Sequence, residues 1–154
     1  MLFRSDRKRH VFDEDIVALV DDQIAHGDDA IQVSRLRVVA GTEGPQTAEI
    51  DLTINGEAVW KTARGNGPVD AIFNAIKEAA PHEADLDLYQ VHAVTEGTDA
   101  QAIVSVRLSA NGRSASARAS DADTLVASAR AYVAALNRLN ALSSARISAQ
   151  HSAA

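Results

Sequence analysis

The chain has 154 residues, a length typical of one domain, and 46% of them are apolar, which is enough for one buried core. Its net charge of −6 and its dispersed basic residues argue against a nucleic-acid partner, because binding to nucleic acid depends on clustered Lys and Arg. It has no cysteine, which excludes disulfides and thiolate chemistry, and no apolar run of membrane-spanning length, so we expect a cytoplasmic protein without a membrane partner.

The first predicted element is a short amphipathic helix at Glu14–His26. Phe12 and Asp13 supply an apolar residue and an N-cap before it, and Gly27 ends it. Its apolar stripe consists of Ile16, Leu19, Val20 and Ile24. We expect residues 1–29 to form an N-terminal edge and a linker helix that stands apart from the rest of the chain.

The remainder of the chain repeats itself after 56 residues. Thr47–Ile54 and Ile103–Ala110 alternate apolar and polar residues in the same phase, as half-buried strands do. Each is followed by Asn-Gly, at Asn55-Gly56 and Asn111-Gly112, the dipeptide favoured in type I′ hairpin turns. Return strands are therefore predicted at Glu57–Ala63 and Arg113–Ala119, and preceding strands at Gln32–Val39 and Leu86–Val94.

A helix is predicted after each return strand, at Pro68–Ala80 and Asp123–Asn140. Pro68 suits the first helical position and Asp123 an N-cap. The fold class is therefore α+β, with two β-β-β-α units related by a pseudo-twofold axis, mostly antiparallel strands, and both helices on a shared sheet face. The expected domain covers residues 30–140, with repeats at about 30–82 and 83–140, and the small, polar residues 141–154 form a flexible tail.

The densest Gly/Pro segment, from Gly65 to Ala71, lies between a predicted strand and a predicted helix. Two glycines allow a ligand close to the backbone, and free N–H groups at a helix start favour a carboxylate or phosphate. A tight strand-to-helix turn would explain the same residues without any ligand. The segment matches neither the Walker A loop nor the dinucleotide fingerprint.

This segment, Gly65-Asn66-Gly67-Pro68-Val69-Asp70-Ala71, resembles the signature Gly-x-Gly-Pro-Val-Asp-Ala of the regulatory domain of 2-isopropylmalate synthases. Other segments are similar to further landmarks of that family, and the resemblance covers about Lys8 to Asn140. They are Leu86-Asp87-Leu88-Tyr89, Gly97-Thr98-Asp99-Ala100-Gln101-Ala102 and Ala131-Tyr132-Val133-Ala134-Ala135-Leu136-Asn137. One departure is Ala119, near which the family more often has glycine.

The resemblance implies a homodimer that binds leucine between the two β-β-β-α units at the subunit contact and gives feedback inhibition of leucine biosynthesis. It implies a catalytic domain in the same enzyme, a metal-binding barrel that condenses acetyl-CoA with 2-oxoisovalerate. The chain itself is then expected to be catalytically silent, with no catalytic residue and no cofactor.

The effector-binding residues that the resemblance implies fall into three groups. The first wall of the pocket consists of Gly65, Asn66, Gly67, Pro68, Val69 and Ala71. The second wall consists of Leu86, Leu88, Tyr89, His92, Ala100 and Ala102. Asp121 and Asp123 are candidates for the ammonium group. Leu86 and Leu88 could instead be plain core residues, and Asp123 could be only an N-cap.

Three other hypotheses about the function stay open. The module could belong to a citramalate synthase, which senses isoleucine, or it could be a purely structural dimerisation module. A free-standing enzyme using Asp121 and Asp123 lacks any sequence signal for a cofactor or nucleophile. The five histidines show no metal-binding spacing, so no metal site is expected.

Overall fold

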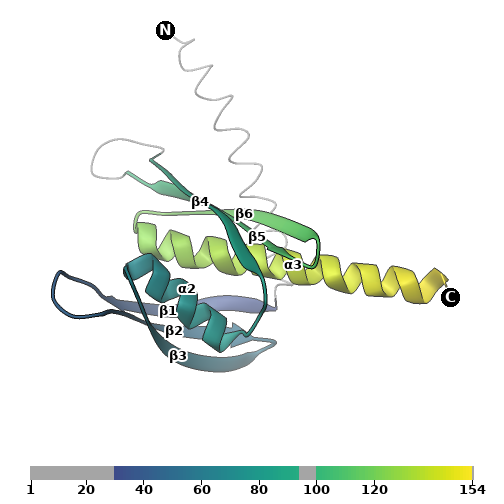
Figure 1. Cartoon of the computed structure of the whole chain (residues 1–154), viewed down its shortest axis with the longest axis horizontal. Coiled ribbons are helices and arrows are strands. Elements are labelled where there is room, and N and C mark those ends of the chain that lie inside the picture. The colour runs from purple at the N-terminus through teal and green to yellow at the C-terminus, as the bar shows by residue number, and fades with distance from the viewer. Residues whose placement is uncertain (1–29, 94–99, 154) are drawn as a thin grey trace, which may run out of the picture.

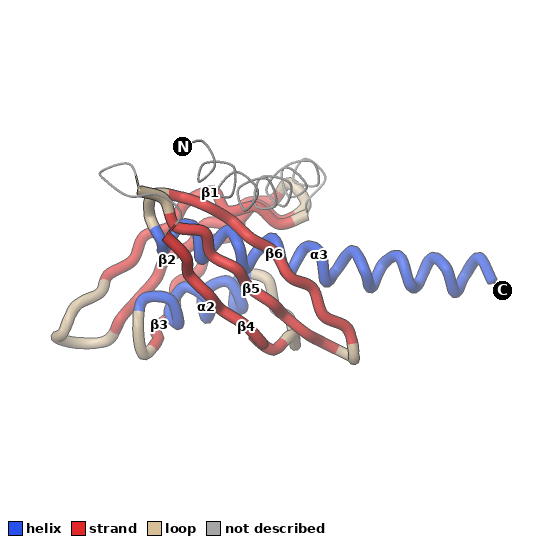
Figure 2. The backbone as a smooth tube through the Cα atoms, turned by 90° about the horizontal axis from the view of Figure 1, so that it is seen from above, coloured by secondary structure: helices blue, strands red, loops and turns tan. Residues whose placement is uncertain are grey.

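The computed structural model of the chain describes residues 30–93 and 100–153 (Figures 1 and 2). The predicted helix at Glu14–His26, and Gly97, Thr98 and Asp99 of the segment that resembles the family, lie outside the described residues.

The described chain is built from two β-β-β-α units, which confirms the predicted α+β class. The first unit contains β1 (Ile31–Val39), β2 (Gln46–Ile54), β3 (Glu57–Gly65) and α2 (Pro68–Ala79). The second contains β4 (Asp85–Ala93), β5 (Ala102–Ala110), β6 (Arg113–Asp121) and α3 (Thr124–Ala153). All neighbouring strands are antiparallel.

The two tight hairpins have the predicted backbone conformation. Asn55 and Gly56 have φ angles of 52° and 86°, and Asn111 and Gly112 have φ angles of 54° and 76°. Positive φ at both central residues defines the type I′ turn, whose twist matches that of the flanking strands. The sequence therefore set the register of both hairpins.

The strands form two separate sheets, which corrects the prediction of one shared sheet face. β1-β2-β3 form one three-stranded sheet, here sheet A, and β4-β5-β6 form another, sheet B. α2 packs on β2 and β3, while α3 packs on β5 and β6 and also reaches β1. Strand alternation identified the buried face of each strand but carried no information on which strands pair between the units.

One core joins the inner faces of both sheets to both helices. Apolar residues of the central strands and of both helices are buried in it, among them Ile50, Leu52, Ile72, Ile76, Val104, Val106, Leu108, Tyr132 and Leu136. The buried Asn137 of α3 links the units, since its Nδ2 donates to Ile31 O at 2.8 Å and its Oδ1 accepts from Ile31 N at 3.1 Å. These bonds satisfy the first backbone groups of edge strand β1.

The predicted end of the last helix at Asn140 is wrong, because α3 continues to Ala153. The residues from Ala141 onward are rich in alanine and contain no glycine or proline to stop a helix. In both views, α3 extends beyond the sheets at the end of the molecule that carries the C-terminus (Figures 1 and 2).

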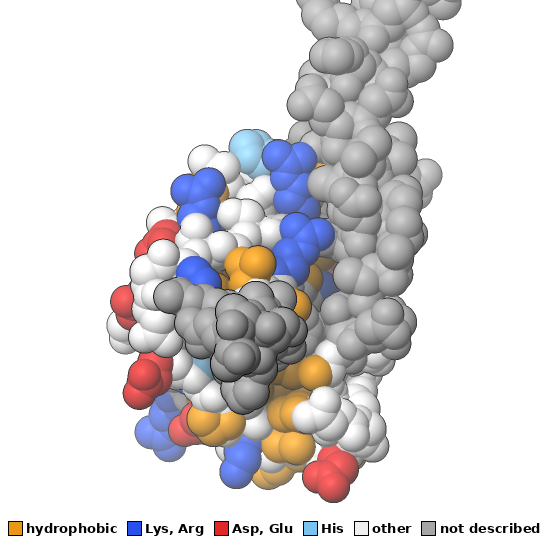
Figure 3. All heavy atoms as spheres, turned by 90° about the vertical axis from the view of Figure 1, so that its right-hand side faces the viewer, with side chains coloured by type: hydrophobic (Ala, Val, Ile, Leu, Met, Phe, Trp, Pro, Cys, Tyr) orange, Lys and Arg blue, Asp and Glu red, His pale blue; other side chains and the backbone are white. Residues whose placement is uncertain are grey.

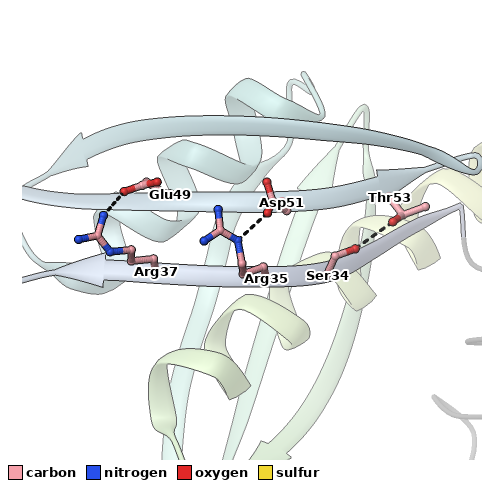
Figure 4. A network of polar contacts seen from close by, with 6 residues as sticks. All are labelled: Ser34, Arg35, Arg37, Glu49, Asp51 and Thr53. Carbon is pink, nitrogen blue, oxygen red and sulfur yellow. Dashed lines mark hydrogen bonds and ion pairs between the residues drawn. The ribbon is translucent and has the colours of Figure 1, made fainter.

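Cross-strand polar pairs cover the outer face of sheet A (Figure 4). Their donor–acceptor distances are 2.6–2.9 Å. The pairs are Arg35–Asp51, Arg37–Glu49 and Ser34–Thr53. Exposed pairs of this kind contribute little to stability, and Trp60, opposite Asp51 on the same face, is 52% exposed.

Beyond the end of α2, His82 is held in one neutral form against the core. Its Nδ1 accepts the Ala84 N–H at 3.1 Å, so its Nε2 carries the proton and faces Tyr132 Oη at 3.1 Å. Partial burial lowers the pKa of His82, and the charge of Lys77 lowers it further. Burial also raises the pKa of Tyr132 to about 12, so its hydroxyl stays protonated.

Stability is therefore expected to fall below neutral pH through His82. The pKa of His82 in the folded state lies below its unfolded value of 6.5. Its contribution to the free energy of unfolding is therefore full above pH 6.5 and is lost as the pH falls toward the folded-state pKa. Urea unfolding between about pH 8 and pH 5 should show wild type losing stability relative to His82→Gln. If the free energy of unfolding depends on pH in the same way for both proteins, His82 is not the group responsible.

Candidate functional site

The start of α2 presents backbone N–H groups that no side chain caps. Gly67 is the N-cap residue and makes no side-chain cap hydrogen bond, and Pro68 at the next position has no N–H. The first intrahelical bond runs from Ala71 N to Gly67 O at 3.0 Å. The N–H groups of Val69 and Asp70 are thus the free donors of this helix start, where the helix dipole also favours an anion.

Side chains of α2 hold the loop before the helix in place. Asp70 Oδ2 accepts the Asn66 N–H at 2.8 Å, and Asn74 Nδ2 donates to Arg64 O at 2.9 Å. Asp70 therefore fixes the loop before the helix, in addition to its favourable place at the positive end of the helix dipole. The loop is fixed on the side of the helix, so its shape does not depend on a ligand.

The two glycines of this loop have different structural roles. A Cβ on Gly65 would lie 2.3 Å from Ala71 N and 2.7 Å from Asp70 Oδ2, so only glycine fits against the helix. A Cβ on Gly67 would meet nothing within 4 Å, and Gly67 has an extended φ of −162°. Neither glycine has a positive φ. Gly67 leaves space at the free N–H groups.

The start of α3 has the equivalent place in the second unit but is already capped. Asp123 Oδ1 accepts the Leu125 N–H at 2.8 Å, which confirms Asp123 as an N-cap. Asp121 Oδ1 accepts the Asp123 N–H at 2.8 Å, and its Oδ2 lies 3.3 Å from Arg130 Nη1. The two starts therefore differ: one offers free N–H donors and the other offers carboxylates.

Both helices begin at the same end of the molecule, as the two perpendicular views agree (Figures 1 and 2). The inner face of sheet B forms a wall beside them. Strand register places Ala102 opposite Asp121, then Val91 opposite Val104, then Tyr89 opposite Val106. The exposed fraction of Val91 is 44%, so apolar surface on this edge strand is left uncovered.

Tyr89 connects this wall to both helices. Its ring packs edge-on against Phe73 of α2, with centroids 5.7 Å apart. Its hydroxyl lies 2.7 Å from the buried Ser128 Oγ, which in turn donates to Thr124 O in the first turn of α3 at 2.7 Å. A molecule that touches Tyr89 would therefore contact a residue fixed to α2, α3 and β4 at once.

Most of the residues expected to bind the effector belong to elements that meet where α2 and α3 begin, at one end of the molecule (Figures 1 and 2). The start of α2 and the loop before it contain Gly65, Asn66, Gly67, Pro68, Val69 and Ala71. Strand β4 contains Tyr89, and the start of β5 contains Ala102, with Ala100 just before it. The residues just before α3 include Asp121 and Asp123.

Three expected residues lie elsewhere in the single chain. Leu88 and His92 are paired with Arg107 and Ile103 on the outer face of sheet B, and Leu86 is at the opposite end of β4. A bulge between Leu86 and Leu88 breaks the simple alternation from which their directions had been inferred.

Val91 and Ser128 were missed by the sequence analysis. The sequence could have indicated Val91 as a site residue, because it lies two residues from Tyr89 on the same strand and so shares its face. Ser128 gave no signal, since a serine within a helix is usually solvent-exposed.

Within residues 30–93 and 100–153, no group of His, Asp and Glu side chains could hold a metal ion. Among the helices of the described part of the chain, none is long and apolar enough to cross a membrane.

The chain is similar to one protein family and to several curated proteins. Residues 10–140 match the family described as LeuA allosteric (dimerisation) domain. The chain is 60% identical over 149 residues to a 2-isopropylmalate synthase of Methylorubrum populi, covering 97% of this chain and 28% of that protein. It is 62% identical over 135 residues to one of Rhodopseudomonas palustris, covering 88% and 26%. The chain thus spans about a quarter of the length of these relatives.

Proposed function

The chain belongs to the LeuA allosteric (dimerisation) domain family, and from this premise we propose that it binds leucine between its two β-β-β-α units and pairs with a second copy. In the proposal, it is the regulatory part of a cytoplasmic 2-isopropylmalate synthase. Bound leucine would give feedback inhibition of the catalytic domain elsewhere in the same enzyme, and the chain alone would be catalytically silent and need no cofactor.

The observation that carries the proposal is the difference between the two helix starts. The uncapped start of α2 offers the N–H groups of Val69 and Asp70 to the carboxylate of an amino acid. The carboxylates of Asp121 and Asp123 at the start of α3 would face its ammonium. One free amino acid would therefore complement both units at once.

The apolar wall of sheet B supplies the place for the side chain. Tyr89, Val91 and Ala102 share the inner face, and Val69 opens α2. A branched aliphatic side chain of a few carbons would cover the exposed part of Val91, with about 0.8 kcal/mol gained for each buried methylene. A charged or large polar side chain would lose its water there without a partner.

Leucine is preferred to isoleucine because of the whole-domain resemblance. The two ligands differ in one methyl position, which is worth roughly 1–3 kcal/mol in an apolar pocket. A citramalate synthase module that senses isoleucine is therefore the second candidate.

The purely structural module is the third candidate, and the departure from the family at Ala119 would favour it. In the structure, Ala119 lies within β6 opposite Val104, two residues before Asp121, and packs against the core. Its side chain is a single methyl group, so the departure from glycine does not by itself exclude a ligand.

A panel of free amino acids in a thermal-shift assay tests the proposal. A ligand at about 100 times its dissociation constant adds about 2.7 kcal/mol of stability. For a domain of this size we expect leucine to raise the Tm by roughly 5–11 °C, with alanine and lysine inactive. A larger shift with isoleucine would favour the second candidate, and no shift with any branched amino acid would leave only the structural module.

A further inference from the structure

Ser128 places a fully buried hydroxyl in a part of α3 that is otherwise rich in buried alanine. Its exposed fraction is 0%, as are those of Ala127, Ala129 and Ala131. Alanine has the higher helix propensity and has no polar group to bury. What the serine adds over alanine is its hydroxyl, so the contacts of that hydroxyl indicate its role.

The hydrogen bonds of Ser128 fix the direction of the Tyr89 hydroxyl. Ser128 Oγ donates to Thr124 O at 2.7 Å, one turn earlier in α3. Tyr89 Oη lies 2.7 Å from Ser128 Oγ. A serine hydroxyl has one proton, and because Thr124 O accepts it, the tyrosine is the donor in the second bond. The only hydroxyl proton of Tyr89 therefore points into the fold, toward α3.

The ring of Tyr89 is held from another side by an aromatic cluster. Its plane lies at 79° to that of Phe73, and Phe73 packs against Tyr132 with the ring centroids 4.4 Å apart. The exposed fractions of Phe73 and Tyr132 are 8% and 4%. Rings packed at the density of a protein core keep one orientation. Tyr89 is thus fixed at both ends, its ring by Phe73 and its hydroxyl by Ser128.

A tyrosine fixed in this way presents carbon atoms to the apolar wall of sheet B. Tyr89 is half-buried and shares the inner face with Val91, whose exposed fraction is 44%. The hydroxyl is turned toward Ser128 and away from that surface. A tyrosine hydroxyl without this partner would offer a donor and an acceptor to a polar ligand. The hydrogen bond to Ser128 therefore decides whether the wall is apolar at Tyr89.

We infer that Ser128 sets the specificity of the effector site by holding the Tyr89 hydroxyl out of the apolar wall. Ser128 acts through Tyr89, so it is a positioning residue that does not touch the ligand. The inference rests on the proposed amino-acid site. It adds a reason why that site would accept leucine and reject a polar side chain of the same shape.

Asparagine is the polar amino acid to compare with leucine. Both side chains branch at Cγ and carry two heavy atoms there, so their shapes are nearly the same. The asparagine amide would lose its hydrogen bonds to water at an apolar wall without gaining others. Wild type should therefore bind leucine at least about 100-fold more tightly than asparagine.

Isothermal titration of the 154-residue chain with leucine and with asparagine tests the inference. In Ser128→Ala the Tyr89 hydroxyl loses its acceptor, so leucine would cover an unpaired polar group and should bind more weakly. The asparagine amide could pair with the same hydroxyl and should bind more tightly. We expect the ratio of the two affinities to fall about tenfold or more, with circular dichroism confirming that the variant folds.

The double variant Tyr89→Phe with Ser128→Ala separates this role from general damage to the fold. It removes the hydroxyl that Ser128→Ala releases. Replacing both partners of a buried hydrogen bond by apolar groups of the same shape is nearly neutral for stability. The double variant should therefore recover the wild-type ratio of leucine to asparagine affinity, whereas a damaged fold would not be repaired by a second substitution.

Ser114→Ala is the matched control. Ser114 is exposed near the start of β6, whereas Asp121 ends the same strand beside the start of α3. Ser114 thus belongs to the opposite end of the molecule, which faces the viewer in Figure 3 and carries hydrophobic, basic and acidic side chains. This variant should bind both amino acids as wild type does.

Two results would overturn the inference while the proposed function stands. One is a wild-type affinity ratio in Ser128→Ala, and the other is a double variant that does not recover the ratio. If wild type itself does not bind leucine, the proposed leucine site fails and this inference fails with it.

Discussion

Gly67→Val is expected to weaken leucine binding about 100-fold while the domain stays folded. Nothing lies within 4 Å of a Cβ at Gly67, so the valine side chain would fill the empty space in front of the free N–H groups. Each charge-assisted hydrogen bond to a ligand carboxylate is worth about 1.5–3 kcal/mol, and the loss of one or two such bonds gives this factor. The backbone at Gly67 is extended, which any residue adopts.

Isothermal titration with leucine measures the effect, and urea unfolding checks the fold. The less favourable N-cap should lower the free energy of unfolding by about 1 kcal/mol. Gly41→Val is the matched control, because a Cβ at Gly41 also meets nothing within 4 Å and Gly41 lies in the β1–β2 turn. Leucine binding by Gly67→Val as tight as wild type would show that the ligand carboxylate binds elsewhere.

Gly65→Ala is expected to destabilise the fold itself. Its Cβ would lie 2.3 Å from Ala71 N, and backbone on both sides would have to move. Overpacking of this kind costs about 3 kcal/mol, which lowers the Tm by roughly 6–12 °C in a domain of this size. Leucine binding should be lost as well, because the start of α2 would be displaced.

Differential scanning calorimetry of Gly65→Ala beside Gly67→Ala separates the two positions. Gly67→Ala adds the same methyl group where there is room, so its Tm should change by less than about 3 °C. Equal melting temperatures for the two variants would show that Gly65 does not contact the helix as the structure has it.

Local features of the fold could be predicted from the sequence because they depend on nearby residues. The Asn-Gly pairs specified both hairpin turns, and the alternation around Ile50 and Val106 identified the buried faces of the central strands. Pro68 and Asp123 marked the starts of both helices. The repeat after 56 residues then gave the second unit from the first.

Features that depend on distant contacts could not be predicted. The strands form two sheets rather than one, and α3 reaches β1, where Asn137 binds Ile31. Periodicity within a strand or helix gives no information on such contacts between units. The β4 bulge turned Leu88 to the outer face, and sequence gives no direct sign of a bulge without glycine. Of the candidate site, the loop at α2 was found from its glycines, whereas the link from Tyr89 to Ser128 required the structure.

The central claim is that the carboxylate of leucine binds the free N–H groups at the start of α2. Two-dimensional amide NMR of the isotopically labelled chain, titrated with leucine, tests this most directly. We expect saturable shifts of the Val69 and Asp70 amide resonances, with smaller changes at Tyr89 and in the first turn of α3. Saturable leucine binding that leaves the Val69 and Asp70 resonances unmoved would contradict it.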